Sequence, residues 1–307
     1  MSPSLEQGAA AVRDFWERHN GLRPALRSRL LDTPNGERLV AEFSFEGAPG
    51  AEPLIAKCYG DDTGEGTFLL MTALAEALGR IKDPVLALPA ALCYDGGRRC
   101  LVQQRVDGTP FLFLAGTKEF LPALRRAGQA LAELHCLNVA AGRPKRIADH
   151  VRELISPHPL ELAERLPSNR GRIGALLAAL EAAEARLAAQ VSPRPIHRDF
   201  HLRQLFLEGR QVWLIDWDLF AKGDPALDVG NFLMYLETRL EADQSAAAEA
   251  FLEGYCARAP DEVRPRLGLY KGLNYLRRAS KHCRLAQPGW TLRSAEMLER
   301  AEACLAA

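Results

Sequence analysis

Short apolar runs that alternate with turn residues dominate the first hundred positions of the chain. Runs of about four to eight residues bounded by Gly, Pro, Asn and Asp are typical of strands, and Pro34-Asn35-Gly36 is a hairpin-turn signal. The predicted strands cover residues 30–32, 39–45, 53–59, 86–88 and 99–106. Residues 67–78 contain no helix breaker and predict one helix. We therefore expect a small, mostly β unit here.

Longer helices are expected from about residue 117 onward, where alanine and leucine become frequent. An apolar helix face with three- and four-residue steps is formed by Leu121, Leu124, Gly128, Leu131 and Leu134. A second helix is predicted over 173–189, and helices resume after a β-rich island at 195–216. The residues Asp107-Gly108-Thr109-Pro110 interrupt both strand and helix. The expected division is therefore an N-lobe at 1–106 and a helical C-lobe at 107–307.

Composition narrows the classes of protein. The 307 residues carry 39 basic and 39 acidic side chains, so no overall charge draws the chain to nucleic acid or to anionic lipid. No uncharged apolar window of about 18 residues occurs, and the first residues lack the features of a secretory signal. The seven cysteines are scattered without a C-x-x-C pair, which favours reduced, buried thiols. We expect a cytoplasmic protein without a membrane or nucleic-acid partner, and its oligomeric state is not indicated.

The β-rich island concentrates residues with catalytic potential. Two apolar runs, 205–207 and 212–215, flank a Gly-bearing polar loop and predict a hairpin. If this hairpin is symmetric about Arg210, Gln204 faces Asp216 across its open end, about 5 Å apart at Cβ. A carboxylate and an amide oxygen are hard ligands suited to Mg²⁺. Asp199 lies five residues before Gln204 and could accept the proton of a hydroxyl during phosphoryl transfer.

The order of these motifs resembles a known family. The chain contains His197-Arg198-Asp199, then a hairpin, then Ile215-Asp216-Trp217, and then Gly223-Asp224-Pro225-Ala226-Leu227-Asp228. This set resembles the catalytic and metal-binding loops of the aminoglycoside phosphotransferase family, whose members have a protein-kinase-like fold. The likeness is sharp over about residues 195–232 and only architectural elsewhere.

The resemblance implies an α+β, bilobal fold with a small β-rich N-lobe that has one helix. The larger, mainly helical C-lobe would hold the catalytic loop and the metal-binding hairpin at 195–218. It also implies an ATP-dependent phosphotransferase that uses Mg²⁺ and transfers the γ-phosphoryl group to a hydroxyl of a small acceptor.

Site residues are carried over one at a time. Asp199 would be the catalytic base, and Gln204 and Asp216 would bind the magnesium ion. Lys57 would grip the α- and β-phosphates. Asp218 is either a further metal contact or a turn cap. The adenine base would pair with the hinge that contains Gln103, Gln104 and Val106. Asp224 and Asp228 would brace the loops, and His197 would pack beneath them.

Three departures from the family pattern stand out. The metal-binding asparagine is replaced by Gln204, one methylene longer. No helix glutamate matches the usual partner of the phosphate-binding lysine, because the aligned position falls near Leu70, with Glu65 and Glu76 out of register. The nucleotide-covering loop, 32–37, contains a single glycine.

Two alternatives to a kinase remain open. His197, Asp199 and His201 alternate along the chain and could hold a transition metal for a hydrolase. The departures from the family pattern also fit a nucleotide-binding regulator without transfer activity, in the manner of a pseudokinase. The chain has neither a Gly-x-Ser-x-Gly elbow nor a Gly-x-x-x-x-Gly-Lys phosphate loop, which removes two other classes of enzyme.

The charge near the C-terminus bears on the acceptor. Residues 264–284 hold seven basic side chains and no acidic ones, whereas an acidic helical stretch at 237–253 lies close by in sequence. If the basic residues face the cleft, they would repel a polycationic aminoglycoside and favour an acceptor with a carboxylate or a phosphate. We therefore expect that antibiotic resistance is not the native role.

Overall fold

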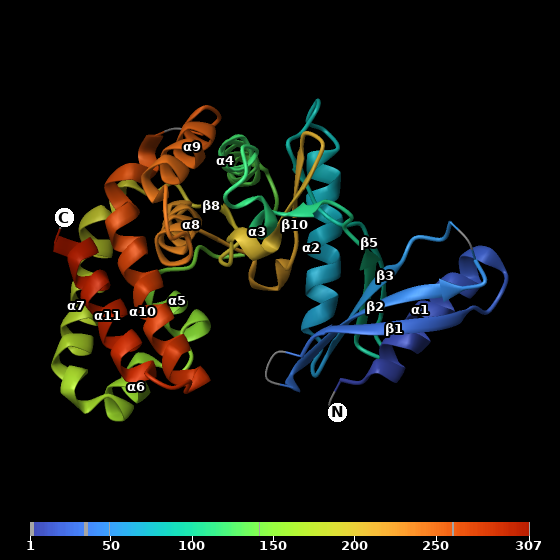
Figure 1. The fold of residues 1–307 in the computed structure, drawn as a ribbon, viewed down its shortest axis with the longest axis horizontal. Coiled ribbons are helices and arrows are strands. Elements are labelled where there is room, and N and C mark those ends of the chain that lie inside the picture. The colour runs from blue at the N-terminus through green and yellow to red at the C-terminus, as the bar shows by residue number, and fades with distance from the viewer. Residues whose placement is uncertain (1–2, 34–35, 49, 141, 260, 307) are drawn as a thin grey trace. The chain divides into compact units, whose positions relative to one another are not determined.

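The computed structural model describes residues 3–33, 36–48, 50–140, 142–259 and 261–306. The chain forms two compact units (Figure 1), one of residues 1–110 and 205–218 and the other of residues 111–204 and 219–307. The division after Pro110 lies close to the expected lobe boundary at residue 106. The hairpin at 205–218, which we expected in the C-lobe, groups with the first unit.

The first unit is built on a five-stranded antiparallel sheet. Its strands are β1 (Ala25–Asp32), β2 (Arg38–Glu46), β3 (Leu54–Tyr59), β5 (Ala91–Asp95) and β6 (Cys100–Gln104), in the order β1-β2-β3-β6-β5. The hairpin expected between residues 30 and 45 is confirmed, although Pro34 and Asn35 of its turn lie outside the described residues. In β2 every second residue is buried, as the period of two requires. Strand β5 was not predicted.

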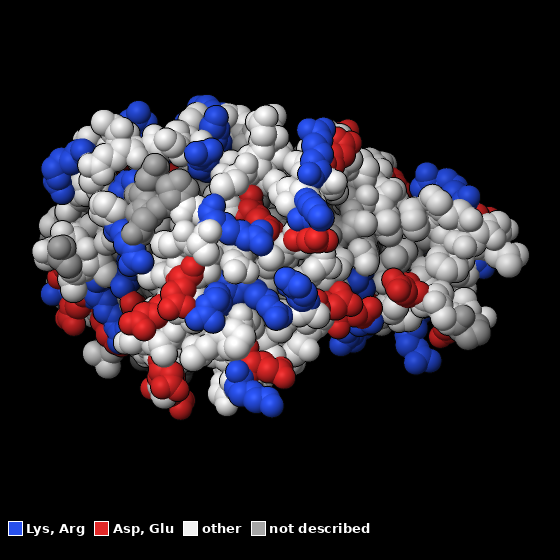
Figure 2. All heavy atoms as spheres, turned by 90° about the horizontal axis from the view of Figure 1, so that it is seen from above, with Lys and Arg blue, Asp and Glu red and all other residues white. Residues whose placement is uncertain are grey.

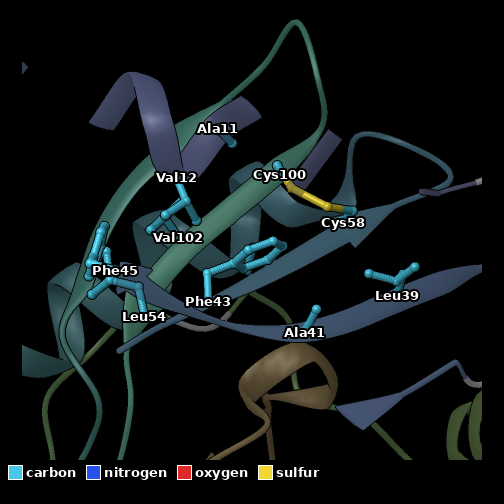
Figure 3. Packing of buried hydrophobic residues seen from close by; sticks show 11 residues of the cluster. Ala11, Val12, Leu39, Ala41, Phe43, Phe45, Leu54, Cys58, Cys100 and Val102 are labelled. Atoms are coloured by element: carbon cyan, nitrogen blue, oxygen red, sulfur yellow. A yellow bond between two sulfur atoms is a disulfide. The ribbon is translucent and has the colours of Figure 1, made fainter. Parts of the chain in front are cut away.

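Two helices accompany this sheet, whereas the sequence predicted one. The predicted helix is α2 (Thr63–Leu78), and the additional helix is α1 (Leu5–Asn20), which packs against β3 and β6. Ser4 caps α1 and forms a capping box with Gln7. The hydrophobic core between α1 and the sheet contains Val12 and Phe43, both fully buried (Figure 3).

The same core contains a disulfide. Cys58 on β3 and Cys100 on β6 are directly opposite one another and are joined by a sulfur–sulfur bond (Figure 3). The expectation of reduced thiols is therefore wrong for this pair. Spacing could not reveal it, because 42 residues separate the two cysteines and only the strand pairing brings them together. The remaining five cysteines are not in disulfide bonds.

A second sheet carries the hairpin. Strands β4 (Leu86–Ala87), β10 (Gln211–Leu214), β9 (Leu205–Glu208) and β7 (Thr109–Pro110) follow one another in that order. In the hairpin Glu208 pairs with Gln211 and Leu205 with Leu214, so the loop has two residues and begins with Gly209 at φ 56°. The register expected from symmetry about Arg210 is wrong by one residue. Gln204 is consequently not paired with Asp216 and lies in the 3₁₀ turn η4 (Leu202–Gln204).

The second unit is largely helical. Its helices are α3 (Phe111–Leu114), α4 (Phe120–Cys136), α5 (Ile147–Leu154), α6 (Pro159–Arg165), α7 (Arg170–Leu187), α8 (Ala226–Arg239), α9 (Gln244–Cys256), α10 (Leu267–Leu285) and α11 (Trp290–Ala306). Strands β8 (Arg194–Ile196) and β11 (Ala221–Gly223) form a small antiparallel pair. Helices α10 and α11 lie side by side (Figure 1). The helices expected at 121–134 and 173–189 correspond to α4 and α7.

Charge is distributed over the surface without a dominant sign. Basic and acidic side chains are interspersed on the face drawn in Figure 2, in agreement with the formal net charge of zero. Within the described part of the chain, no helix combines the length and the apolar character that crossing a bilayer requires.

The backbones of helices α4 and α9 approach each other closely at two glycines, Gly128 and Gly254. A Cβ atom added at Gly254 would lie 1.8 Å from the carbonyl oxygen of Arg125, and one added at Gly128 would lie 2.1 Å from that of Phe251. Side chains at either position would therefore push the two backbones apart. The Gly128 of the predicted apolar face is thus a packing residue.

Replacing Gly254 by alanine is expected to lower the free energy of unfolding by about 1–3 kcal/mol or more, because the backbone of α4 cannot yield as a flexible side chain would. Chemical denaturation measures this change. The matched control is Gly174→Ala on α7, where an added Cβ meets nothing within 4 Å. We expect the control to stabilise the protein by up to about 1 kcal/mol. Equal effects of the two substitutions would contradict the packing argument.

Candidate active site

A buried lysine lies at the centre of the polar residues of the first unit. Lys57 on β3 is 6% exposed, and its Nζ lies 2.6 Å from Oδ1 of Asp216 and 2.9 Å from Oδ2 of Asp218. Burial lowers the pKa of Lys57, and nearby Arg38 lowers it further, whereas Asp216 opposes this change. Two carboxylates at ion-pair distance compensate for the loss of hydration. Lys57 is therefore held in one place with its ammonium directed at the end of the hairpin.

Asp218 is the residue that most side chains of this cluster share. Its Oδ1 accepts hydrogen bonds from Tyr59 at 2.9 Å and from Thr67 at 3.2 Å. Its Oδ2 accepts from Lys57 and from Arg38. Burial raises the pKa of Tyr59, so its phenol remains a donor. With two donors on each oxygen, Asp218 is an anchor for the lysine.

This arrangement supplies the lysine partner that the sequence did not reveal. Helix α2 contributes Thr67 to the cluster, while Glu65 and Glu76 are exposed on its surface. The carboxylates that pair with Lys57 come instead from the segment after β10, about 160 residues later in the chain. Such a partner is visible only in the tertiary structure.

Asp216 follows the hairpin in a strained backbone conformation. Its φ is 68°, a region that residues with a side chain rarely adopt and that typically costs about 1–3 kcal/mol. Arg38, on β2, lies 3.3 Å from Asp216 Oδ1 and also pairs with Asp218. Arg38 is thus a second cation, besides Lys57, next to the same two carboxylates. Arg38 was not among the site residues predicted from the sequence.

The segment expected to bind adenine comes at the end of β6. Gln103 is almost fully buried and pairs with Ile55 and Ala91, and the Gln104 N–H donates to the carbonyl oxygen of Ala90. Val106 lies beyond the last strand residue, Gln104, in a segment without regular structure. The strand thus ends where a hinge was expected.

The second unit holds the expected catalytic loop. Asp199 follows β8, and its side chain is 20% exposed. Its Oδ1 accepts a hydrogen bond from Arg277 at 2.9 Å, and its Oδ2 lies 3.4 Å from both His201 Nε2 and Gln204 Nε2. Burial acts to raise the pKa of Asp199, but Arg277 and the histidines outweigh it and hold this pKa well below its usual value. Asp199 is therefore ionised and able to accept a proton throughout the neutral range.

A fully buried carboxylate fixes the backbone of this loop. Asp228, at the start of α8, accepts hydrogen bonds from the N–H groups of His197 at 2.6 Å and Arg198 at 2.7 Å. His135 Nε2 lies 3.2 Å from the same carboxylate. Arg198 has φ 69°, so a second strained residue comes directly before Asp199. These contacts orient the loop in the bracing role expected of Asp228.

Asp224 braces a different part of the unit. Both of its carboxylate oxygens bind Arg266, at 2.6 and 3.1 Å, and both side chains are 2% exposed. Oδ1 also accepts from the N–H of Ala226 at the start of α8. A buried bidentate pair of this kind fixes the geometry of the turn after β11.

Comparisons with known proteins identify the family of the chain. A family described as the phosphotransferase enzyme family matches residues 28–266. The chain belongs to this phosphotransferase family. The resemblance seen in the sequence is thereby confirmed. No curated protein matches the chain in sequence.

Solved structures show the fold that accompanies this membership. A spectinomycin phosphotransferase bound to ADP and spectinomycin is 12% identical, with a TM-score of 0.62, and the match covers 96% of this chain and 98% of that one. A choline/ethanolamine kinase family protein from Mesorhizobium loti is 17% identical (TM-score 0.60; 97% and 95% covered). A putative fructosamine-3-kinase from Thermobifida fusca is 19% identical (TM-score 0.61; 97% and 99% covered). The α+β, protein-kinase-like fold is confirmed, with α1 as an additional helix of the first unit.

The residues predicted to bind a metal are of two kinds, oxygen ligands and histidines. Among the described residues no three His, Cys, Asp or Glu side chains are placed together to hold a metal. Of the residues in the hydrolase alternative, His197 is fully buried, while His201 Nε2 lies 3.4 Å from Asp199 Oδ2. The carboxylate of Asp216 is a hard oxygen ligand of the kind that Mg²⁺ prefers, and in this structure it pairs with Lys57 and Arg38.

Proposed function

We propose that this phosphotransferase is a small-molecule kinase that uses Mg²⁺ and ATP to phosphorylate a hydroxyl group. The observation that carries the proposal is the ion pair between buried Lys57 and Asp216, 2.6 Å apart. A buried ammonium held by carboxylates is suited to bind polyphosphate once a divalent ion binds the carboxylate. Solved relatives bound to ADP or to AMP-PNP support the use of a nucleotide.

Each side chain then has a distinct role. Lys57 binds the α- and β-phosphates, with Asp218 as its anchor. Arg38 lies on β2 beside the same carboxylates. It supplies part of the phosphate binding that the glycine-poor covering loop would otherwise have to provide. Asp216 and Gln204 would supply oxygen ligands for the magnesium ion, which would neutralise phosphate charge when bound. Adenine binds at the segment of Gln103, Gln104 and Val106, where Val106 lies beyond the last strand residue.

Asp199 is the catalytic base of this proposal. Its carboxylate accepts the proton of the acceptor hydroxyl while the oxygen attacks the γ-phosphorus. A new oxygen–phosphorus bond forms, the bond between the γ-phosphorus and the bridging oxygen breaks, and the electron pair leaves with ADP. Asp228 keeps the loop in place, because it holds two consecutive backbone N–H groups around Arg198.

Transfer of ³²P from γ-labelled ATP to a panel of hydroxyl compounds tests the function. We expect phosphorylated product that depends on Mg²⁺ and disappears with a chelator. Binding of Mg-ATP without transfer to any compound would instead support a nucleotide-binding regulator, the alternative that Gln204 leaves open. Failure to bind nucleotide at all would overturn both.

A further inference from the structure

Helix α10 presents a basic side chain to the proposed base in the second unit, and further basic residues follow it in sequence. Arg277 on α10 donates to Asp199 Oδ1 at 2.9 Å and to the carbonyl oxygen of Arg198 at 3.0 Å. Lys281 follows four residues later, on the same face of the helix, and Asp199 and Arg277 are among the charges that act on it. Arg278 lies between them in sequence. We call Arg277, Arg278 and Lys281 the α10 basic surface.

Further cations adjoin this surface from other elements. Arg239 at the end of α8 and Arg203 in η4 both act electrostatically on Arg278. Arg239 lies over the ring of Tyr235, 5.5 Å from its centroid. His201 stacks on the same ring. Basic side chains of α8 and η4 thus act on Arg278, which follows Arg277, the residue of α10 that contacts Asp199.

Acidic residues in the described part of the chain leave most of these cations uncompensated. Arg277 pairs with Asp199, but Arg278 and Lys281 have no carboxylate at ion-pair distance, and neither do Arg203 and Arg239. Like charges held together in this way repel one another, which an anionic ligand would relieve.

Two of the five acidic residues between 237 and 253 pair with basic side chains elsewhere in the second unit. Glu237 binds Lys271 at 2.6 Å and the Tyr275 hydroxyl at 2.5 Å, and Glu253 on α9 pairs with Arg125. The expected acidic stretch is therefore divided between α8, a turn and α9. Glu241, Asp243 and Glu249 are exposed.

The partial burial of Arg278 also favours an anionic ligand. Arg278 is half-buried, and its Nε is buried without a hydrogen-bond partner. Burial lowers the pKa of Arg278, and Arg239 and Arg203 lower it further. Buried guanidinium groups are generally paired, because an unpaired buried donor is destabilising. A ligand with acceptor oxygens would satisfy this one.

We propose that the acceptor of the phosphoryl group is an anionic alcohol, with a carboxylate or a phosphate that binds the α10 basic surface. This inference rests on the proposed function, since it concerns the acceptor of the same reaction. The anionic group contacts Arg278 and Lys281, and the hydroxyl of the same molecule faces Asp199. Arg277 keeps Asp199 ionised and correctly oriented. The proton passes from the hydroxyl to Asp199, and the hydroxyl oxygen receives the γ-phosphoryl group from ATP, which leaves as ADP.

Matched hydroxyl compounds test the acceptor class with the full-length protein. The panel pairs carboxylate-bearing, phosphate-bearing, neutral and cationic alcohols of equal carbon number, and transfer from γ-labelled ATP gives kcat/KM for each. We expect anionic members to exceed their neutral and cationic counterparts by at least about tenfold. The carboxylate and phosphate arms distinguish the two sources of negative charge. Preference for cationic alcohols would overturn the proposal.

A binding experiment separates this inference from the proposed function. Inorganic phosphate is titrated calorimetrically into protein saturated with ADP, so that the nucleotide site does not contribute. Arg278→Gln combined with Lys281→Gln should weaken binding at least about tenfold, whereas Arg278→Lys should retain most of it. Arg186→Gln, an exposed residue of α7, is the control and should change nothing.

The outcomes are distinct. Phosphate binding that is lost in the double variant, together with no transfer to any alcohol, would reject the kinase and leave the anion site standing. Transfer to neutral or cationic alcohols with unaltered phosphate binding in the double variant would reject the anion site and leave the kinase. Unaltered thermal unfolding of each variant shows that the protein has folded.

Discussion

Replacing Asp199 by asparagine is expected to reduce kcat by about 10²–10⁴-fold, the range typical of a general base. Asparagine has the same size as aspartate but cannot accept the proton of the hydroxyl. Its hydrogen bond to Arg277 is weaker because the amide is uncharged. The dissociation constant of Mg-ATP should change less than about twofold, because Asp199 is not among the nucleotide ligands. Steady-state kinetics and nucleotide titration measure the two quantities.

The pH dependence follows from the same residue. The pKa of Asp199 is held well below its usual value, and the ionised form is the active base. Its contribution is therefore complete at neutral pH and is lost only as the pH falls through that depressed pKa. Any change in rate between pH 6 and pH 8 must come from another group. An Asp199→Asn variant that retains a tenth of the wild-type kcat would show that the base is misassigned.

Replacing Asp216 by alanine is expected to weaken binding of Mg-ATP by about 100-fold, since a carboxylate ligand of the metal is removed. The loss should vanish when nucleotide is titrated without Mg²⁺. The fold should survive, because Lys57 keeps Asp218 as a partner at 2.9 Å. Fluorescence titration with a labelled nucleotide, at several Mg²⁺ concentrations, measures the effect.

Asp218→Asn is the matched comparison for this experiment. Asp218 is surrounded by protein donors on both oxygens, so its loss should loosen Lys57 and weaken nucleotide binding to a similar extent with and without Mg²⁺. If the two variants showed the same Mg²⁺ dependence, the division of roles between Asp216 and Asp218 would be incorrect.

Local sequence patterns predicted many of the strands and three of the helices with their approximate bounds. The hairpin of β1 and β2, helix α2 and the long helices α4 and α7 follow from periodicity and turn residues, which act over a few neighbouring residues. Helix α1 was missed even though Ser4 and Gln7 form a capping box, a signal that the sequence does contain. Strand β5 was also missed.

The pairing register of the hairpin after the catalytic loop could not be predicted from the sequence pattern. Its two strands were predicted correctly, but the register depends on whether the turn has two residues or three. Gly209 adopts φ 56° and allows the shorter turn, which shifts the pairing by one residue. Because the side chains of a strand alternate, a one-residue error changes which residues face one another.

By itself, the sequence determined the family, the fold class and the candidate residues Lys57, Asp199 and Asp216, because these depend on motifs and short-range order. Only the tertiary structure decided which charges meet. The pairing of Lys57 with Asp218 and of Asp199 with Arg277 joins residues that are 161 and 78 positions apart. Electrostatic interactions depend on distance in space, and no pattern along the chain encodes that distance.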